Sequence, residues 1–325
     1  MMNNPWDKIN PPSKDVSARR VDHTHSLDLF WARDHLGHYL FIYEFPPEEA
    51  IPKVNLPDLA GIQTAYIPAD GSIPRNRLVL LLNEQSNWEL FFSLCTDLFQ
   101  ATRRAKTSAT AVQTILRRLA RWHDFLKKNR NDLLTEEKIK GLIGELLFIK
   151  NYLVPVFGAG QAIQFWQGPE GLPQDFNVNS SAIEVKCQSG ASSPYVKITS
   201  ANQLCPQLPE MYLFVITLGK TTPETEGAIN LPGLVAHIRG SLQSNASSQI
   251  ERFNDLLYMI GYIDSEQYLK FSYILAGEKM FEVMEGFPRI CASDIHHGIV
   301  KLSYNISLSE CEPFEGQPDW IGNTS

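Results

Sequence analysis

QDFNVNSSAIEVK, residues 174–186, is the stretch that decides the predicted fold of this chain. Two short runs in which polar and apolar residues alternate flank a polar turn, which is the pattern of a pair of β-strands. Side chains on a strand point to alternate faces, so Glu184 and Lys186 share one face. Asp175 lies on the strand before the turn, and the hairpin brings its carboxylate towards this charged pair. Two carboxylates and a lysine beside an apolar layer suit a divalent cation and an activated water.

A helix is predicted over residues 135–152, before the hairpin. Thr135 is a good N-cap residue because two glutamates follow it in the first turn. Apolar residues repeat at helical spacing along this segment and are numerous enough to predict a largely buried helix. Glu145 falls on the shoulder of the apolar stripe, and Gly144 permits the close approach of another backbone.

The rest of the chain alternates between predicted strands and helices, which predicts an α/β or α+β protein. The further predicted strands span residues 38–45, 61–67, 77–82, 163–167, 212–218, 269–275, 279–283 and 298–307. The further predicted helices span residues 88–102, 108–128, 231–243 and 246–260, with a short one that begins at Ser200.

Four regions follow from this order. Residues 1–20 are polar and predicted to be loose, and residues 21–130 form an N-terminal α+β region that ends in a basic helix. Residues 131–220 form the core that contains the charged hairpin, and residues 221–325 form an α+β extension packed on it.

Composition is that of a globular protein, with 43% hydrophobic and 20% charged residues in 325. No unbroken apolar run approaches the ~20 residues that span a membrane, and the first residues lack a signal-peptide core. We therefore expect a cytoplasmic protein with no membrane partner. The five cysteines are scattered, odd in number and without a Cys-x-x-Cys pair, which favours reduced, packed thiols over a disulfide framework or zinc site.

A formal net charge of −7 gives no global signal for nucleic acid, but charge is distributed unevenly. Nine basic residues and one acid, Asp124, lie in residues 103–130; the basic ones are Arg103, Arg104, Lys106, Arg117, Arg118, Arg121, Lys127, Lys128 and Arg130. A stripe centred on Arg117, Arg118 and Arg121 could follow DNA phosphates. The alternative is a solvated helix face, because neighbouring apolar residues give this helix a core side.

The order of these elements resembles that of the PD-(D/E)XK nuclease superfamily. A helix with Glu145, a strand, a strand with Asp175, a strand with Glu184-Val185-Lys186 and a helix near Ser200 follow one another over about residues 135–205. The resemblance implies a restriction-endonuclease-like core, in which helices flank a mixed sheet and the metal site lies where two strands diverge. Over most of its length the chain is also similar to bacterial PD-(D/E)XK-motif proteins of restriction and phage-defence islands.

The resemblance also implies a role for each charged residue. Asp175 and Glu184, with the Val185 carbonyl, would hold Mg²⁺, for which Mn²⁺ can substitute. Lys186 would be the catalytic lysine and Glu145 the assisting acid on the helix. Gln188 lies on the same strand face and would contact DNA or the water around the metal. The chain departs from the superfamily in one respect: Gln174 separates Pro173 from Asp175, where the proline–aspartate pair is otherwise contiguous.

Two functions are consistent with these residues. The first is a Mg²⁺-dependent DNA endonuclease of a bacterial restriction or phage-defence system, with DNA as substrate and with other defence proteins, such as an ATPase or a methyltransferase, as partners. The alternative is a non-catalytic DNA-binding or scaffolding subunit that keeps the nuclease-like fold, since Glu-x-Lys is common on surface strands. An oligomer is compatible with either function.

Other chemistries find less support in the sequence. Neither a P-loop nor a dinucleotide-binding glycine motif occurs, and no Gly-x-Ser-x-Gly occurs, which disfavours nucleotide-cofactor enzymes and serine hydrolases. The histidine pairs at 23 and 25 and at 296 and 297 lack a recognisable third ligand and are expected to be loop residues. Trp166 precedes the hairpin and is the one tryptophan singled out as a candidate to stack on a base.

Overall fold

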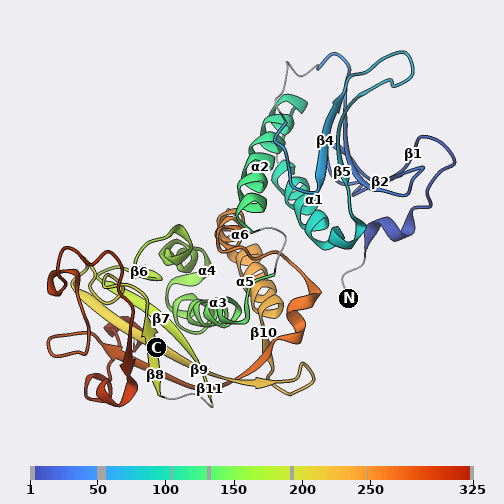
Figure 1. The fold of residues 1–325 in the computed structure, drawn as a ribbon. Helices are drawn as coiled ribbons and strands as arrows, with labels where there is room; N and C mark the ends of the chain where they lie inside the picture. The colour runs from blue at the N-terminus through green and yellow to red at the C-terminus, as the bar shows by residue number, and fades with distance from the viewer. Residues whose placement is uncertain are drawn as a thin grey trace. The chain divides into compact units, whose positions relative to one another are not determined.

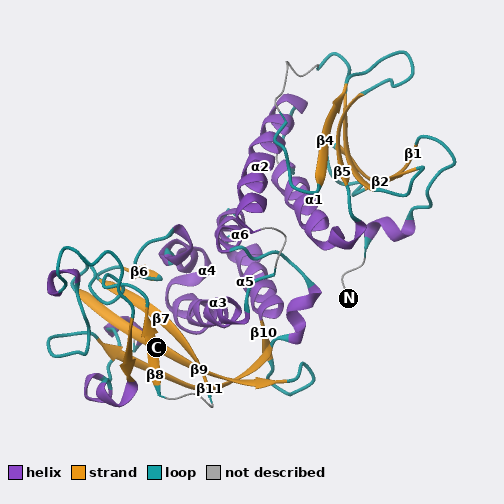
Figure 2. Ribbon diagram, in the orientation of Figure 1, coloured by secondary structure: helices purple, strands orange, loops and turns teal. Residues whose placement is uncertain are grey.

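The computed structural model describes residues 4–49, 56–103, 105–129, 133–190, 194–246 and 248–322. Helices and strands are mixed along the chain, as predicted (Figures 1 and 2). They divide into two units: Met1–Leu133 with Ile263–Ser265, and Leu134–Tyr262 with Glu266–Ser325. The charged hairpin belongs to the second unit.

The first unit contains a five-stranded antiparallel sheet and two helices. The strand order is β1 (Val16–Arg20), β2 (Asp28–Asp34), β3 (Tyr39–Phe45), β5 (Asn76–Leu82) and β4 (Ile62–Ile67). Helix α1 (Trp88–Thr102) packs against α2 (Ser108–Asn129). In β3, all residues except Glu44 are buried, as expected for a central strand.

Residues 5–9 pack into this unit's core, in contrast to the loose structure expected for residues 1–20. Trp6 is fully buried in a short 3-10 helix (Pro5–Lys8), and its indole N–H donates to the Leu40 carbonyl at 2.9 Å. Its ring stacks on Tyr39 with centroids 5.0 Å apart. One buried tryptophan offers enough apolar area to anchor a segment that is otherwise polar.

His25 is buried beside α1 in the same unit. Its Nδ1 accepts a hydrogen bond from the Leu27 backbone N–H at 3.1 Å, and its Nε2 lies 3.1 Å from the Phe99 carbonyl oxygen. Only the neutral ring with its proton on Nε2 satisfies both contacts. Burial lowers the pKa of His25, and the nearby Arg103 charge lowers it further.

We expect the free energy of unfolding to fall by about 1 kcal/mol through His25 as the pH drops below about 6.5, because protonation breaks one buried hydrogen bond. The folded pKa is below the unfolded value, so this stability is present above that pH and is lost on acidification. Urea unfolding at pH 7.5 and 5.5 would measure the change, with His25→Gln as the comparison. An equal decrease in both proteins would contradict the assignment.

The second unit contains a mixed five-stranded sheet in the order β10 (Ile229–Asn230), β11 (Ser272–Glu282), β9 (Glu210–Thr221), β7 (Ser181–Ser189) and β6 (Phe176–Val178). Strands β7 and β9 are parallel, and the other pairs are antiparallel. A second, two-stranded sheet joins β8 (Tyr195–Ile198) to β12 (Tyr304–Ser307).

Helices and the two-stranded sheet cover opposite faces of β7. Helix α3 (Glu136–Phe148) lies over Val185 and Cys187, while Ala182 packs in a buried cluster with residues of β8, β9 and β12. The other helices of the unit are α4 (Val154–Phe165), α5 (Leu231–Asn245) and α6 (Gln249–Ile260). The mixed sheet flanked by helices confirms the predicted fold class.

Several predicted elements differ from the structure. Residues 163–165 end α4 rather than begin a strand, because they continue a buried helical face, and only Trp166 bridges to Phe176. Residues 201–204 form a turn instead of a helix, and residues 298–303 precede β12 without strand structure. The two strands predicted over 269–283 are one, β11, with an irregularity between Leu275 and Gly277.

One helical stretch, Glu136–Phe165, is long and apolar enough to cross a membrane by length and composition, with a mean hydropathy of 1.4 in its most apolar window. Charged residues, among them Glu145 and Lys150, interrupt this stretch, so it is not an unbroken apolar run. Half of that window, 50%, is buried within the protein, and Gly158 interrupts the helix with a φ of 76°. Burial within the protein therefore accounts for half of this apolar stretch.

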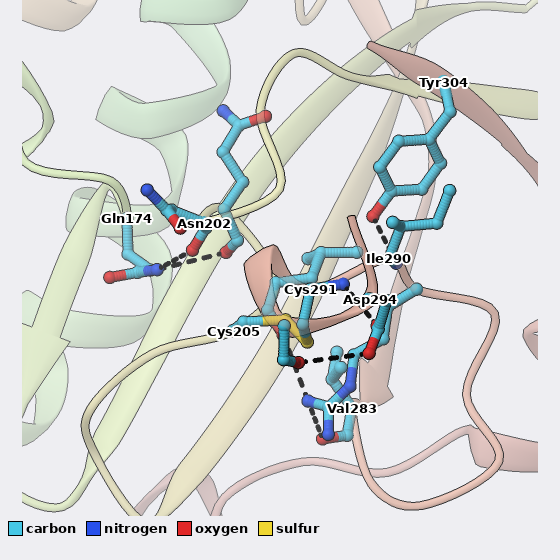
Figure 3. Close-up of a disulfide and its surroundings, with 12 residues drawn as sticks. Gln174, Asn202, Cys205, Val283, Ile290, Cys291, Asp294 and Tyr304 are labelled. Atoms are coloured by element: carbon cyan, nitrogen blue, oxygen red, sulfur yellow. Dashed lines mark hydrogen bonds between the residues drawn. A yellow bond between two sulfur atoms is a disulfide. The ribbon is translucent and has the colours of Figure 1, made fainter. Parts of the chain in front are cut away.

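Cys205 and Cys291 form a disulfide, with Cα atoms 5.8 Å apart across a separation of 86 residues (Figure 3). The expectation that all five cysteines are reduced is therefore wrong for this pair, which sequence spacing could not reveal because the partners meet only through the fold. The bond links the turn after β8 to the segment that precedes β12. Cys95, Cys187 and Cys311 are free.

Candidate active site

The site lies where β6 and β7 diverge. Strand β6 pairs with only three residues of β7, from Ser181 to Ile183. Asp175 precedes β6, and its Oδ2 accepts a hydrogen bond from the Val185 backbone N–H at 2.8 Å. The Asp175 side chain thus bonds to β7 beyond the last backbone pair between β6 and β7. That pairing ends at Ile183, so β6 does not pair with β7 at Glu184.

Glu184 and Lys186 meet at this edge, as predicted from their spacing. The Lys186 Nζ lies 2.5 Å from Oε1 of Glu184, and the Gln203 side-chain amide donates to the same oxygen at 2.6 Å. The Glu184 side chain is 2% exposed. Its second oxygen, Oε2, is buried and has no hydrogen-bond partner. Such an atom is costly unless a ligand satisfies it.

Glu145 approaches from α3. Its Oε2 accepts a hydrogen bond from the Trp166 indole N–H at 2.6 Å. A Cβ atom on Gly168 would lie 2.8 Å from Asp175 Oδ1 and 3.5 Å from Glu145 Oε2, so both carboxylates flank this glycine. The absence of a side chain at Gly168 leaves room for them.

Trp166 and Gly168 were not predicted to shape the site. Trp166 is fully buried, which rules out the base-stacking role considered for it. Its position shortly before Asp175 indicated that it lies near the site. Its hydrogen bond to Glu145, 21 residues earlier in the sequence, could not be predicted from sequence spacing.

The site brings three carboxyl groups and one ammonium group together away from water. Burial, reinforced by the Asp175 charge, raises the pKa of Glu145 to about 8. Burial also raises the pKa of Asp175 and, strongly, that of Glu184. Burial alone would lower the pKa of Lys186, but the neighbouring carboxylates outweigh this effect and raise it. Three acids beside one ammonium form a site that a divalent cation would neutralise.

The donor atoms fit Mg²⁺. Asp175 and Glu184 offer carboxylate oxygens, and the unpartnered Glu184 Oε2 is free to bind. The Val185 N–H points at Asp175, and the N–H and C=O of one strand residue point to the same side, so its carbonyl faces the same edge. Among the described residues, no three His, Cys, Asp or Glu side chains form a metal-binding group. Mg²⁺ prefers hard oxygen ligands, usually takes one or two carboxylates and keeps several waters.

The residues predicted to contact nucleic acid differ in their exposure to solvent. Gln188 is half-buried on β7 and donates to the Thr217 hydroxyl at 2.9 Å. Arg117 and Arg121 are exposed on α2, as a phosphate-binding face requires.

Arg118 is a correction to that prediction. Its side chain is 3% exposed and lies 3.8 Å from Asp97, which also accepts the Trp122 indole N–H at 3.0 Å. It belongs to the interface between α1 and α2 and is not available to DNA. Arg104, Arg130 and the side chain of Lys128 lie outside the described residues.

A cavity of about 340 Å³ adjoins the turn after β8. The residues that line it include Thr199, Asn202, His296, His297 and Lys301. His296 and His297 lie in the irregular segment before β12, so they are loop residues as expected. Asn202 directly precedes Gln203 in the chain, so the turn that contributes to the cavity also contacts Glu184.

A family model described as "Putative PD-(D/E)XK family member, (DUF4420)" matches residues 2–309 of the chain. The chain belongs to this family. The match extends the resemblance of residues 135–205 over nearly the whole sequence. No curated protein and no solved structure matches the chain. Membership in the family indicates a nuclease-like function.

Proposed function

We propose that this protein is a Mg²⁺-dependent DNA endonuclease. The observation that carries the proposal is the buried, unpartnered Oε2 of Glu184, at a strand edge that also presents the Asp175 carboxylate and the Val185 carbonyl. An oxygen in this position is satisfied when a cation binds. The family match supports a nuclease-like function.

Asp175, Glu184 and the Val185 carbonyl would hold the ion. Bound Mg²⁺ lowers the pKa of coordinated water and screens the charge on a phosphate, which are the two requirements of phosphodiester hydrolysis. Lys186 is 18% exposed, so its ammonium can orient the attacking water and stabilise negative charge on the phosphate oxygens. Glu145, with a pKa of about 8, can exchange a proton near neutral pH or support a second ion.

We place this activity in a cytoplasmic bacterial restriction or phage-defence system. The net charge of −7 disfavours strong binding to DNA by the whole protein, so a partner such as an ATPase or a methyltransferase would deliver the substrate. The exposed Arg117 and Arg121 would add local contacts to phosphates.

Plasmid cleavage tests the proposal. Wild-type protein with Mg²⁺ or Mn²⁺ should nick or linearise supercoiled DNA, and EDTA should stop it. Asp175→Ala and Lys186→Ala should each reduce the rate by about 10²-fold or more, in line with the loss of one group that stabilises transition-state charge. Lys197→Ala removes an exposed lysine of β8 and should retain activity.

Each other result has a definite meaning. Equal cleavage by all variants would exclude this site as the source of activity. Binding of DNA by the wild-type protein without cleavage would favour the alternative, a DNA-binding or scaffolding subunit with the nuclease-like fold.

A further inference from the structure

We infer that Gln203 is a positioning residue that determines which oxygen of Glu184 faces the cation. This inference rests on the proposed metal site and adds to it a residue outside the PD-(D/E)XK motif. Gln203 acts through Glu184 and not on the substrate itself. It lies in the turn after β8, 19 residues from Glu184 in the sequence.

The orientation of the Gln203 amide follows from its neighbours. Its oxygen accepts hydrogen bonds from the Thr199 backbone N–H at 2.7 Å and from the Thr199 hydroxyl at 3.0 Å. A backbone N–H can only donate, so the amide oxygen must face Thr199. The amide nitrogen therefore faces Glu184, where it donates to Oε1 at 2.6 Å.

A second glutamine fixes the backbone of the same turn. Gln174 is 7% exposed, and its side-chain nitrogen donates to the carbonyl oxygens of Asn202 at 2.6 Å and Gln203 at 3.3 Å. Figure 3 shows Gln174 pointing towards Asn202. Gln174 directly precedes Asp175, so it links the segment that carries one proposed ligand to the turn whose Gln203 contacts the other, Glu184.

This link gives a role to the residue by which the chain departs from its superfamily. The side chain inserted between Pro173 and Asp175 is buried and hydrogen-bonded, and is therefore part of the site's support. Arg289 adds a further contact to the turn, because its Nη1 donates to the Leu204 carbonyl at 3.1 Å.

Two donors on one oxygen leave the other oxygen free. Lys186 and Gln203 both contact Oε1 of Glu184, while Oε2 has no partner. The hydrogen bond from Gln203 opposes rotation of the Glu184 carboxylate, because rotation would break it. Without Gln203 the carboxylate could rotate without that loss. The cation would then bind a less ordered ligand, and its affinity would fall.

Binding of Mn²⁺, followed by electron paramagnetic resonance of the free ion, tests this inference without relying on activity. Gln203→Ala should raise the Mn²⁺ Kd by about 10-fold or more, the size of effect that residues supporting metal ligands have. Gln174→Ala should raise it by a smaller factor, because the Gln203 side chain remains. Gln207→Ala removes an exposed glutamine four residues further on and should leave the Kd unchanged.

The dependence of cleavage on metal separates positioning from a structural role. High Mn²⁺ should restore the rate of Gln203→Ala to within a few-fold of wild type, but should not restore Asp175→Ala. An unchanged Kd in Gln203→Ala, or a loss of cleavage that saturating metal cannot reverse in a folded variant, would overturn the inference.

The inference and the proposed function fail in different ways. Wild-type protein that binds Mn²⁺ but leaves DNA intact would refute the nuclease and still allow the Kd of Gln203→Ala to be measured. Wild-type protein that binds no Mn²⁺ would refute both.

Discussion

Lys186→Met is expected to lower the free energy of unfolding by about 3 kcal/mol in metal-free buffer, because it leaves a buried carboxylate without its counter-charge. The Glu184 side chain is 2% exposed, and its Oε1 would keep a hydrogen bond from Gln203 alone. We take the lower end of the range for broken buried ion pairs, since the Lys186 side chain is 18% exposed.

The double variant Glu184→Gln/Lys186→Met should recover most of this loss and lie within about 1 kcal/mol of the wild-type stability. Removing both charges of a buried pair is often neutral, whereas removing one is not. Both variants should lose Mg²⁺-dependent cleavage by about 10²-fold or more. The double variant would thus recover stability without recovering cleavage activity.

Urea unfolding in EDTA measures the stability, and plasmid cleavage measures the activity. Lys197→Met is the matched control, because it removes an exposed lysine and should change neither quantity. A double variant that is as unstable as Lys186→Met would show that the lysine stabilises the fold by packing and not by pairing with Glu184.

Gly144→Ala is expected to destabilise the protein by about 1–3 kcal/mol, the usual effect of an added methyl group in a packed core. A Cβ atom at Gly144 would overlap Cys187 Sγ and lie 3.3 Å from a methyl group of Val185. Both neighbours are on β7, so relief of the overlap would shift α3 or the strand that carries Glu184. Activity should therefore fall with stability.

Gly141→Ala is the matched control on the same helix. A Cβ atom there would have nothing within 4 Å, so the variant should be as stable as wild type or more stable by up to about 1 kcal/mol. The double variant Gly144→Ala/Cys187→Ala removes the overlapping sulfur and should recover part of the loss. Thermal and urea unfolding would measure all three. Equal stability of Gly144→Ala and Gly141→Ala would contradict the close packing of α3 on β7.

The local part of the site could be predicted from the sequence. Alternation along residues 181–189 places Glu184 and Lys186 on one face, and the helical stripe with its N-cap at Thr135 places Glu145 at the edge of a buried helix. Gly144 was predicted to allow close approach of a backbone. In the structure its nearest neighbours are the side chains of Cys187 and Val185.

The rest depends on contacts between distant segments. Gln203 reaches Glu184 only because the turn after β8 folds back onto β7, and Trp166 reaches Glu145 only because α4 ends beside α3. Periodicity is local and carries no information on such contacts. For the same reason Arg118 was assigned to the surface: its charge was visible in the sequence, but its burial against Asp97 was not.

Because Cys205 and Cys291 form a disulfide, the redox state of the cell compartment determines the covalent structure of this protein. Cys205 lies two residues after Gln203, and its bond to Cys291 closes a loop of 86 residues. Cytosolic thiols are normally kept reduced, and a protein expressed there would carry five thiols in place of three. Oxidised and reduced preparations are therefore chemically different samples, and the thiol content of each needs to be known before their metal affinities are compared.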